Sequence, residues 1–260
     1  MASVKSWFRH VTNKLHQKRH RERSVAIHGF VFIQPTRKRS ALKRFLLTVF
    51  LAVASIGGVS AGGLKSLENF VKTVKTGQAD FTQVVTSPAR EGQAPRVKTS
   101  SGRFEFSRPN RFRFDYLKPF VQTIVADGQT LWLHDVDLNQ VTARKQSAVL
   151  GSTPAALIAS AADVQALQAD FVLADAPDRD GLQWVLATPR SRDGQLQSVR
   201  VGFRAAGDAA ADAGALAVLE ILDSFGQRSV LTFKQMQHNP ALAASAFVFK
   251  PPAGADVIRQ

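Results

Sequence analysis

The chain has 260 residues, a formal net charge of +14 and no cysteine. Residues 1–61 carry 12 of the 34 basic residues but only one of the 20 acidic ones, so residues 62–260 have a net charge of only +3. The high charge of the whole chain is therefore no sign that its main part binds nucleic acid. The lack of cysteine excludes disulfide bonds, a catalytic thiolate and a lipid-attachment cysteine within this sequence.

Residues 37–61 have the three regions of a cleavable secretory signal peptide. Basic residues from Arg37 to Arg44 precede an apolar run from Phe45 to Ala54, and Val59-Ser60-Ala61 offers residues that a signal peptidase reads. The apolar run is shorter than the roughly 20 residues of a membrane-spanning helix. We therefore expect a soluble, unanchored periplasmic protein that begins at Gly62 and forms a single domain over residues 62–260.

Residues 1–36 form a basic extension in front of this signal. Arg, Lys and His dominate from Lys14 to Arg23, without an apolar period. Such a tail could bind nucleic acid. We favour instead a gene start placed too far upstream, because the basic region of a signal peptide is usually short.

An amphipathic helix is predicted at the start of the mature chain. Its apolar residues recur at spacings of three and four: Leu64, Leu67, Val71 and Val74. Charged residues, mostly lysines, take the opposite face. Gly77 is expected to end this helix.

Two strands with an aromatic and a charged face follow. Phe or Tyr alternates with charged or polar residues in 103–107 and again in 111–116, and Arg108-Pro109-Asn110 forms the turn between them. Asp127-Gly128 closes the next hairpin. Further strand-like runs are residues 120–126, 131–134, 182–186, 199–203, 218–222 and 230–233. About ten to twelve strands at hairpin-like spacing predict an antiparallel sandwich or barrel.

One short helix interrupts the strands. Ser152-Thr153-Pro154 reads as an N-cap followed by a proline in the first turn, and residues 155–159 continue the helix. It is weakly amphipathic, which favours a flap over the sheet.

Residues for catalysis are scarce. The mature part has two histidines, His134 and His238, which are far apart in sequence and not in a metal-ligand spacing. Asp135 and Asp137 lie in a tight connection, where Asp commonly serves the turn. The motifs of serine hydrolases, P-loops and dinucleotide-binding folds are absent. We expect no catalytic residue, no metal site and no cofactor. The aromatic sheet face could be an ordinary core or the wall of a ligand cavity, and alternation alone does not separate the two.

Residues 102–114 read Gly-Arg-Phe-Glu-Phe-Ser-Arg-Pro-Asn-Arg-Phe-Arg-Phe. Further segments match the same family pattern in the same order. They are residues 80–83, 127–132, 140–142, 151–154 with 157–159, and 247–254 with 256–257. Each is weak alone. Together and in order, over nearly all of residues 62–260, they resemble the outer-membrane lipoprotein carrier proteins, the LolA family of periplasmic chaperones.

The resemblance implies an unclosed antiparallel β-barrel, covered by an N-terminal helix and short lid helices that enclose an apolar cavity. It implies a monomer that collects triacylated lipoproteins from an inner-membrane ABC transporter (LolCDE-type) and delivers them to an outer-membrane receptor lipoprotein (LolB-type). The receptor has a similar fold but keeps a lipidated cysteine, which this sequence lacks. No nucleic acid is implied as a partner.

The resemblance also implies roles for single residues. Arg108 matches an arginine that lies at the family's cavity and hydrogen-bonds to the lid, although the residue pattern alone favours a solvent-facing turn arginine. The implied acyl-chain lining is Leu67, Val71, Phe104, Phe106, Phe112, Phe114, Leu157 and Ile158. The chain departs from some relatives at Ala155-Ala156, where they carry bulkier apolar residues.

Three other functions stay open. One is a lipoprotein-sensing or lipid-binding regulatory domain of the same fold, which usually accompanies a second domain. Another is an exported enzyme, disfavoured by the scarcity of histidine and the lack of cysteine. The last is nucleic-acid binding through residues 1–36, which requires that segment to survive processing.

Overall fold

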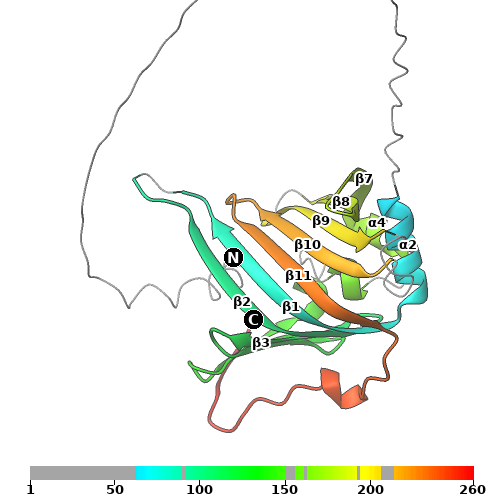
Figure 1. Cartoon of the computed structure of the whole chain (residues 1–260). Coiled ribbons are helices and arrows are strands. Elements are labelled where there is room, and N and C mark those ends of the chain that lie inside the picture. Colours follow the sequence, from blue (N-terminus) through cyan, green and yellow to red (C-terminus); the bar gives the residue numbers. More distant parts are fainter. Residues whose placement is uncertain (1–61, 90–91, 150–155, 161–162, 192–193, 206–213) are drawn as a thin grey trace, which may run out of the picture.

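The computed structural model describes residues 62–89, 92–149, 156–160, 163–191, 194–205 and 214–260. In these residues one 12-stranded sheet has the order β12-β6-β5-β4-β3-β2-β1-β11-β10-β9-β8-β7. The sheet curves but its two edge strands, β12 and β7, do not pair with each other (Figure 1). The prediction of an unclosed barrel of ten to twelve strands is confirmed. The basic extension and the signal peptide lie outside the described residues.

The strands are β1 (Thr76–Ser87), β2 (Arg96–Ser107), β3 (Arg111–Lys118), β4 (Gln122–Ala126), β5 (Thr130–Asp135), β6 (Gln140–Lys145), β7 (Phe171–Arg179), β8 (Leu182–Pro189), β9 (Leu196–Arg204), β10 (Leu216–Asp223), β11 (Arg228–His238) and β12 (Asp256–Arg259). The helical segments are α2 (Gly63–Thr73), α3 (Gln146–Val149), the π-helix η2 (Ala156–Ser160), α4 (Val164–Asp170) and the 3₁₀-helix η3 (Ala244–Phe247). The sequence predicted one helix within the strands, whereas α3, η2 and α4 all lie between β6 and β7. The predicted cap at 152–154 and Ala155 lie outside the described residues.

Neighbouring strands are antiparallel except for β12, which pairs in parallel with β6. The antiparallel pairs between strands that follow one another in sequence come from hairpin connections, as predicted, whereas β1 pairs with β11 from the far end of the chain. A long segment without strands separates β11 from β12, and such a segment can return the chain in either direction. The strand pattern therefore could not predict that β12 pairs in parallel with β6.

The period-two pattern of β2 and β3 produces two different faces of the sheet. Phe104 lies directly opposite Phe114, and Phe106 lies opposite Phe112. Directly opposite residues share a face, so these four rings gather on one side, which we call the core face. The charged partners in the pattern point to the other side, the outer face.

Helix α2 packs on the sheet over β7, β8 and β9 (Figure 1). The helix ends at Thr73 and Val74 is already extended, so the prediction that Gly77 ends it is wrong. Gly77 lies in β1 instead. A Cβ atom there would lie 2.2 Å from the Phe106 ring, so the glycine is needed for close packing between β1 and β2. No helix of the described residues is long and apolar enough to cross a membrane.

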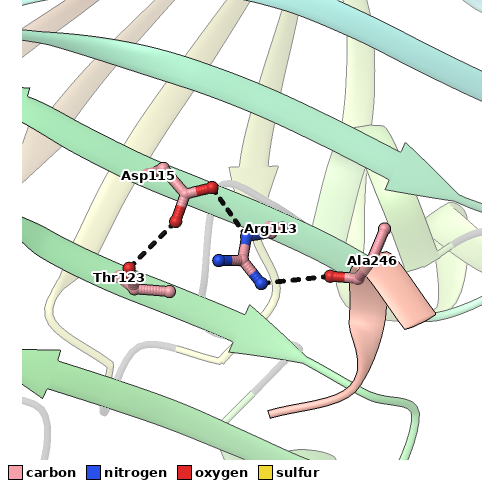
Figure 2. A network of polar contacts seen from close by, with 4 residues as sticks. All are labelled: Arg113, Asp115, Thr123 and Ala246. Carbon is pink, nitrogen blue, oxygen red and sulfur yellow. Dashed lines mark hydrogen bonds and ion pairs between the residues drawn. The ribbon is translucent and has the colours of Figure 1, made fainter.

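The segment after β11 crosses the outer face of the sheet. Figure 2 shows Arg113 on β3 donating to the carbonyl oxygen of Ala246 (3.2 Å) while it also pairs with Asp115 (2.6 Å). The Phe249 ring lies 5.5 Å from that of Trp132 on β5. The C-terminal segment thereby covers part of the face that alternation alone would leave in solvent.

Candidate functional site

The eight residues predicted to line an acyl-chain site all belong to one buried cluster beneath the helices. Their side chains are between 0% and 8% exposed: Leu67, Val71, Phe104, Phe106, Phe112, Phe114, Leu157 and Ile158. Helix α2 supplies the first two, η2 supplies the last two, and β2 and β3 supply the phenylalanines. The structure thus brings together residues that are up to 91 positions apart in sequence.

The phenylalanines of this cluster contact one another directly. The Phe104 and Phe114 rings are stacked with centroids 4.4 Å apart, and Phe112 meets Phe114 edge-on at 6.0 Å. Such pairs add about 0.5–1.5 kcal/mol each to the burial of the rings. These contacts lie within and between the neighbouring strands β2 and β3, so the rings form one continuous aromatic surface on the core face.

The sequence analysis missed a further aromatic residue of the cluster on α2. Phe70 is 2% exposed, and its ring lies 6.0 Å from that of Phe106 and 5.6 Å from that of Phe203. Phe70 follows Leu67 by three positions, so the helical spacing that selected Leu67 and Val71 could have found it. Phe81, Tyr116, Phe171, Phe203 and Phe233 from β1, β3, β7, β9 and β11 also belong to this cluster.

Arg108 lies in the turn that follows β2, but its side chain is buried rather than exposed to solvent. Its guanidinium lies 4.9 Å from the centroid of the Phe70 ring and 5.0 Å from that of Phe106. Nη1 donates a hydrogen bond to the carbonyl oxygen of Val74, the residue that caps α2. Nε and Nη2 are also buried and have no hydrogen-bond partner among the described residues.

Burial lowers the pKa of Arg108 from 12.5 to about 10. The side chain therefore stays positively charged at neutral pH. Two aromatic faces and one carbonyl oxygen stabilise this charge, but they satisfy only part of its donors. The unpaired donors make burial of this cation costly, so the side chain would gain free energy by moving to a better acceptor or to solvent.

The turn from Arg108 to Asn110 joins three helical segments. The backbone N–H of Arg108 donates to Lys75 O (2.8 Å), next to the end of α2, and that of Asn110 donates to Ala159 O of η2 (2.9 Å). The Gln146 side chain of α3 donates to Asn110 O (2.6 Å). A bond from Arg108 to a lid helix stays a prediction. Among the described residues its side chain bonds the C-cap of α2, while the neighbouring backbone bonds η2.

Little in the described residues suggests chemistry on a substrate. No group of three or more histidine or acidic side chains in them could hold a metal ion. Asp135 accepts a hydrogen bond from the backbone N–H of Leu138 (3.1 Å), as expected for an aspartate that serves a turn. His134 packs its ring against Phe249, with centroids 5.8 Å apart.

Comparison with known proteins agrees with this architecture. Residues 72–250 match the family model described as "Outer membrane lipoprotein carrier protein LolA". A protein of Albidiferax ferrireducens named outer-membrane lipoprotein carrier protein is 74% identical over 219 residues, which are 84% of this chain and 100% of that protein. A protein of the same name from Leptothrix cholodnii is 48% identical over 224 residues, 86% of this chain and 98% of that protein.

Among solved structures, the crystal structure of a LolA superfamily protein from Nitrosomonas europaea matches 72% of this chain and 96% of its own, with 14% identity and a TM-score of 0.44. A TM-score this low does not by itself establish a shared fold. The family match and the two close relatives do establish the relationship. The chain belongs to the LolA family of outer membrane lipoprotein carrier proteins.

Proposed function

We propose that this protein is a periplasmic chaperone that binds the acyl chains of lipoproteins released from the inner membrane and carries them to an outer-membrane receptor. The observation that carries the proposal is the 74% identity, over the whole length of the relative, to a protein named outer-membrane lipoprotein carrier protein. The buried aromatic cluster under α2 and η2 supports it, because an acyl chain needs an apolar interior that can open. The protein acts by binding and catalyses no reaction.

A carrier must release its cargo, so its affinity for acyl chains has to stay moderate. Each methylene of a buried acyl chain contributes about 0.8 kcal/mol. Three chains of about sixteen carbons would supply more than 30 kcal/mol, whereas non-covalent affinities saturate near 18–21 kcal/mol. Cargo held that tightly would never be released. Separating Phe70 of α2 from Phe106 of the sheet on opening offsets part of the gain, so affinity stays moderate.

The same proposal assigns partners and location. The carrier works as a monomer, receives cargo from an inner-membrane ABC transporter and passes it to a receptor lipoprotein of the outer membrane. Export by the signal of residues 37–61 places it in the periplasm, with cleavage before Gly62. N-terminal sequencing of the protein from cells should return Gly62, and recovery of residues 1–36 would contradict this and favour the nucleic-acid alternative.

Binding of a fluorescent triacylated lipopeptide tests the function directly. We expect saturable binding that long acyl chains compete for, and little binding of the same peptide without acyl chains. Added salt should change the affinity little because the contacts are apolar, whereas binding to a polyanion weakens steeply with salt. Equal affinity for the two peptides, or no binding by the folded protein, would contradict the proposal.

A further inference from the structure

A row of buried polar side chains lies inside the otherwise apolar interior. The hydroxyl of Tyr116 on β3 donates to Gln83 Oε1 on β1 (2.9 Å), and Gln83 Nε2 donates to the hydroxyl oxygen of Ser229 on β11 (2.7 Å). These side chains are 6%, 7% and 1% exposed, respectively. We call Tyr116, Gln83 and Ser229 the polar triad. Polar groups at such depth cost stability unless they have partners or a function.

The triad faces the same side of the sheet as the aromatic cluster. Gln83 lies between the buried Phe81 and Val85 in the alternation of β1, so it belongs to the core face. The Tyr116 ring lies 5.0 Å from that of Phe81 and 6.4 Å from that of Phe114. The polar triad therefore borders the surface along which an acyl chain would lie.

A glycine permits Tyr116 to reach across the intervening strand. Gly102 on β2 lies directly opposite both Tyr116 and Phe81. A Cβ atom at this position would lie 1.9 Å from the carbonyl oxygen of Asp115 and 3.0 Å from the Phe81 ring. The contact between β3 and β1 is thus a built feature of the sheet, made possible by one residue without a side chain.

The direction of the hydrogen bonds leaves one donor unused. Because Tyr116 donates to Oε1, the amide of Gln83 is oriented with Nε2 toward Ser229. A serine hydroxyl has one hydrogen and two acceptor sites. Ser229 uses an acceptor site for Gln83, and among the described residues none accepts its hydrogen. Burial raises the pKa of Tyr116, so the phenol keeps its proton at neutral pH.

We propose that the polar triad is a subsite for the ester carbonyl that joins an acyl chain to its glyceryl group, with the Ser229 hydroxyl as the donor. This inference rests on the proposed carrier function. An ester carbonyl accepts a hydrogen bond but donates none, so it matches the unused hydrogen of Ser229. Its hydrocarbon chain would then run along Phe81, Phe114 and the rest of the aromatic cluster. A purely apolar wall would take any hydrocarbon, whereas this donor selects acyl esters.

A comparison of an ester with the matching ether tests the subsite. A diacylglycerol and a dialkylglycerol ether of equal chain length each compete with a fluorescent acyl probe for the protein purified from cells that express the full chain. The wild type should bind the ester about fivefold more tightly than the ether, which is the affinity ratio that one ordinary hydrogen bond provides. Ser229→Ala should lose the preference and keep its affinity for the ether. Ser229→Thr, which retains a hydroxyl, should keep the preference.

The control is Ser198→Ala on β9, since Ser198 lies on the outer face opposite Leu222 and should leave the preference unchanged. If wild type and Ser229→Ala bind ester and ether equally, the subsite is wrong and the carrier function stands. If the wild type binds neither lipid, the proposed function fails and the inference with it.

A second measurement needs no variant and so does not depend on the folding of Ser229→Ala. The infrared carbonyl band of a ¹³C-labelled ester bound to the wild type should lie at lower frequency than in dry alkane, as for a hydrogen-bonded carbonyl. A band at the alkane frequency would overturn the inference.

Discussion

A buried guanidinium ties the first helix to the turn between β2 and β3. Arg108 donates to Val74 O and lies over the rings of both Phe70 and Phe106. The sequence pattern alone favoured a solvent-facing turn residue, and the resemblance to the family pointed to an interior role. The residue pattern did not predict the burial of Arg108, because its partner is a backbone carbonyl 34 positions away and no local spacing indicates such a contact.

Arg108→Ala should loosen α2 without unfolding the sheet. A hydrogen bond from a charged donor contributes about 1.5–3 kcal/mol, so its loss should raise the open population about tenfold or more. Hydrogen exchange of the α2 amides should accelerate accordingly, and acyl-probe exchange should become faster. The control is Arg111→Ala, because Arg111 contacts Phe247 on the outer face (5.9 Å from the ring centroid). Equal exchange in wild type and Arg108→Ala would refute a gating role.

Two hairpin aspartates should respond to pH in opposite directions. Burial would raise the pKa of Asp127, but hydrogen bonds from Thr130, Trp132 and Gln129 outweigh it, and the net pKa lies below 3.8. Its stabilisation is therefore present above the unfolded pKa and lost as pH falls through the folded pKa. For Asp223 burial dominates over its backbone hydrogen bonds and raises the pKa, so stabilisation is present in acid and lost as pH rises.

Asp127→Asn should lower the free energy of unfolding at pH 7 by about 1 kcal/mol, and the loss should shrink below the unfolded pKa of 3.8. Asp223→Asn is the matched variant, and its loss should be larger in acid than at pH 7. Urea denaturation at pH 7 and pH 3 measures both. The same pH trend in the two variants would contradict this assignment.

At the scale of elements, the strands with strict alternation were the most predictable. The alternation of Phe104, Phe106, Phe112 and Phe114 predicted one aromatic face on each strand, and the structure confirms it by placing the four rings on the core face. The end of α2 was mispredicted because a glycine does not only end helices. It also occurs in strands where a side chain would clash with a neighbour. Gly77 serves strand packing against Phe106, a tertiary contact that the local sequence does not contain.

The burial of outward-facing residues was the other feature that the sequence pattern did not predict. Strand β12 and the segment with Ala246 and Phe249 bury outward-facing residues of β5 and β6, such as Val141 at 0% exposure. Alternation predicts one wet face and so assigns these positions to solvent. Only the course of the C-terminal segment, which is set by long-range contacts, decides otherwise.

The docking of α2 on β8 depends on a glycine at its first residue. A Cβ atom on Gly63 would lie 2.1 Å from the carbonyl oxygen of Trp184, and that backbone cannot yield. Gly63→Ala should therefore lower stability by about 1–3 kcal/mol, despite the higher helix propensity of alanine. At Gly62 the added methyl group would meet the flexible end of the Gln183 side chain, whose shift costs less than that of a backbone although it strains the hydrogen bond from Ser66.

Thermal unfolding and α2 amide exchange of Gly63→Ala and Gly62→Ala give the comparison. We expect a lower Tm and faster α2 exchange for the first variant, with little change for the second. Equal behaviour of the two variants would show that α2 does not seat on β8 as described.

At the scale of the whole molecule, the two faces of the open sheet have different roles. Its core face, under α2 and η2, gathers the apolar residues that acyl chains require, and its outer face is held by the C-terminal segment. The 12-stranded sheet offers a large continuous surface, and α2 and η2 lie over part of it. We expect these helices to move when cargo binds, because acyl chains must enter and leave the interior.

Mass spectrometry under native conditions, on the protein isolated from the periplasmic fraction, tests the central claim most directly. The account predicts a population whose mass is that of residues 62–260 plus one triacylated lipoprotein, and release of that lipoprotein when the complex is denatured. Isolation of the mature chain with no lipoprotein, from cells that are actively making lipoproteins, would contradict it.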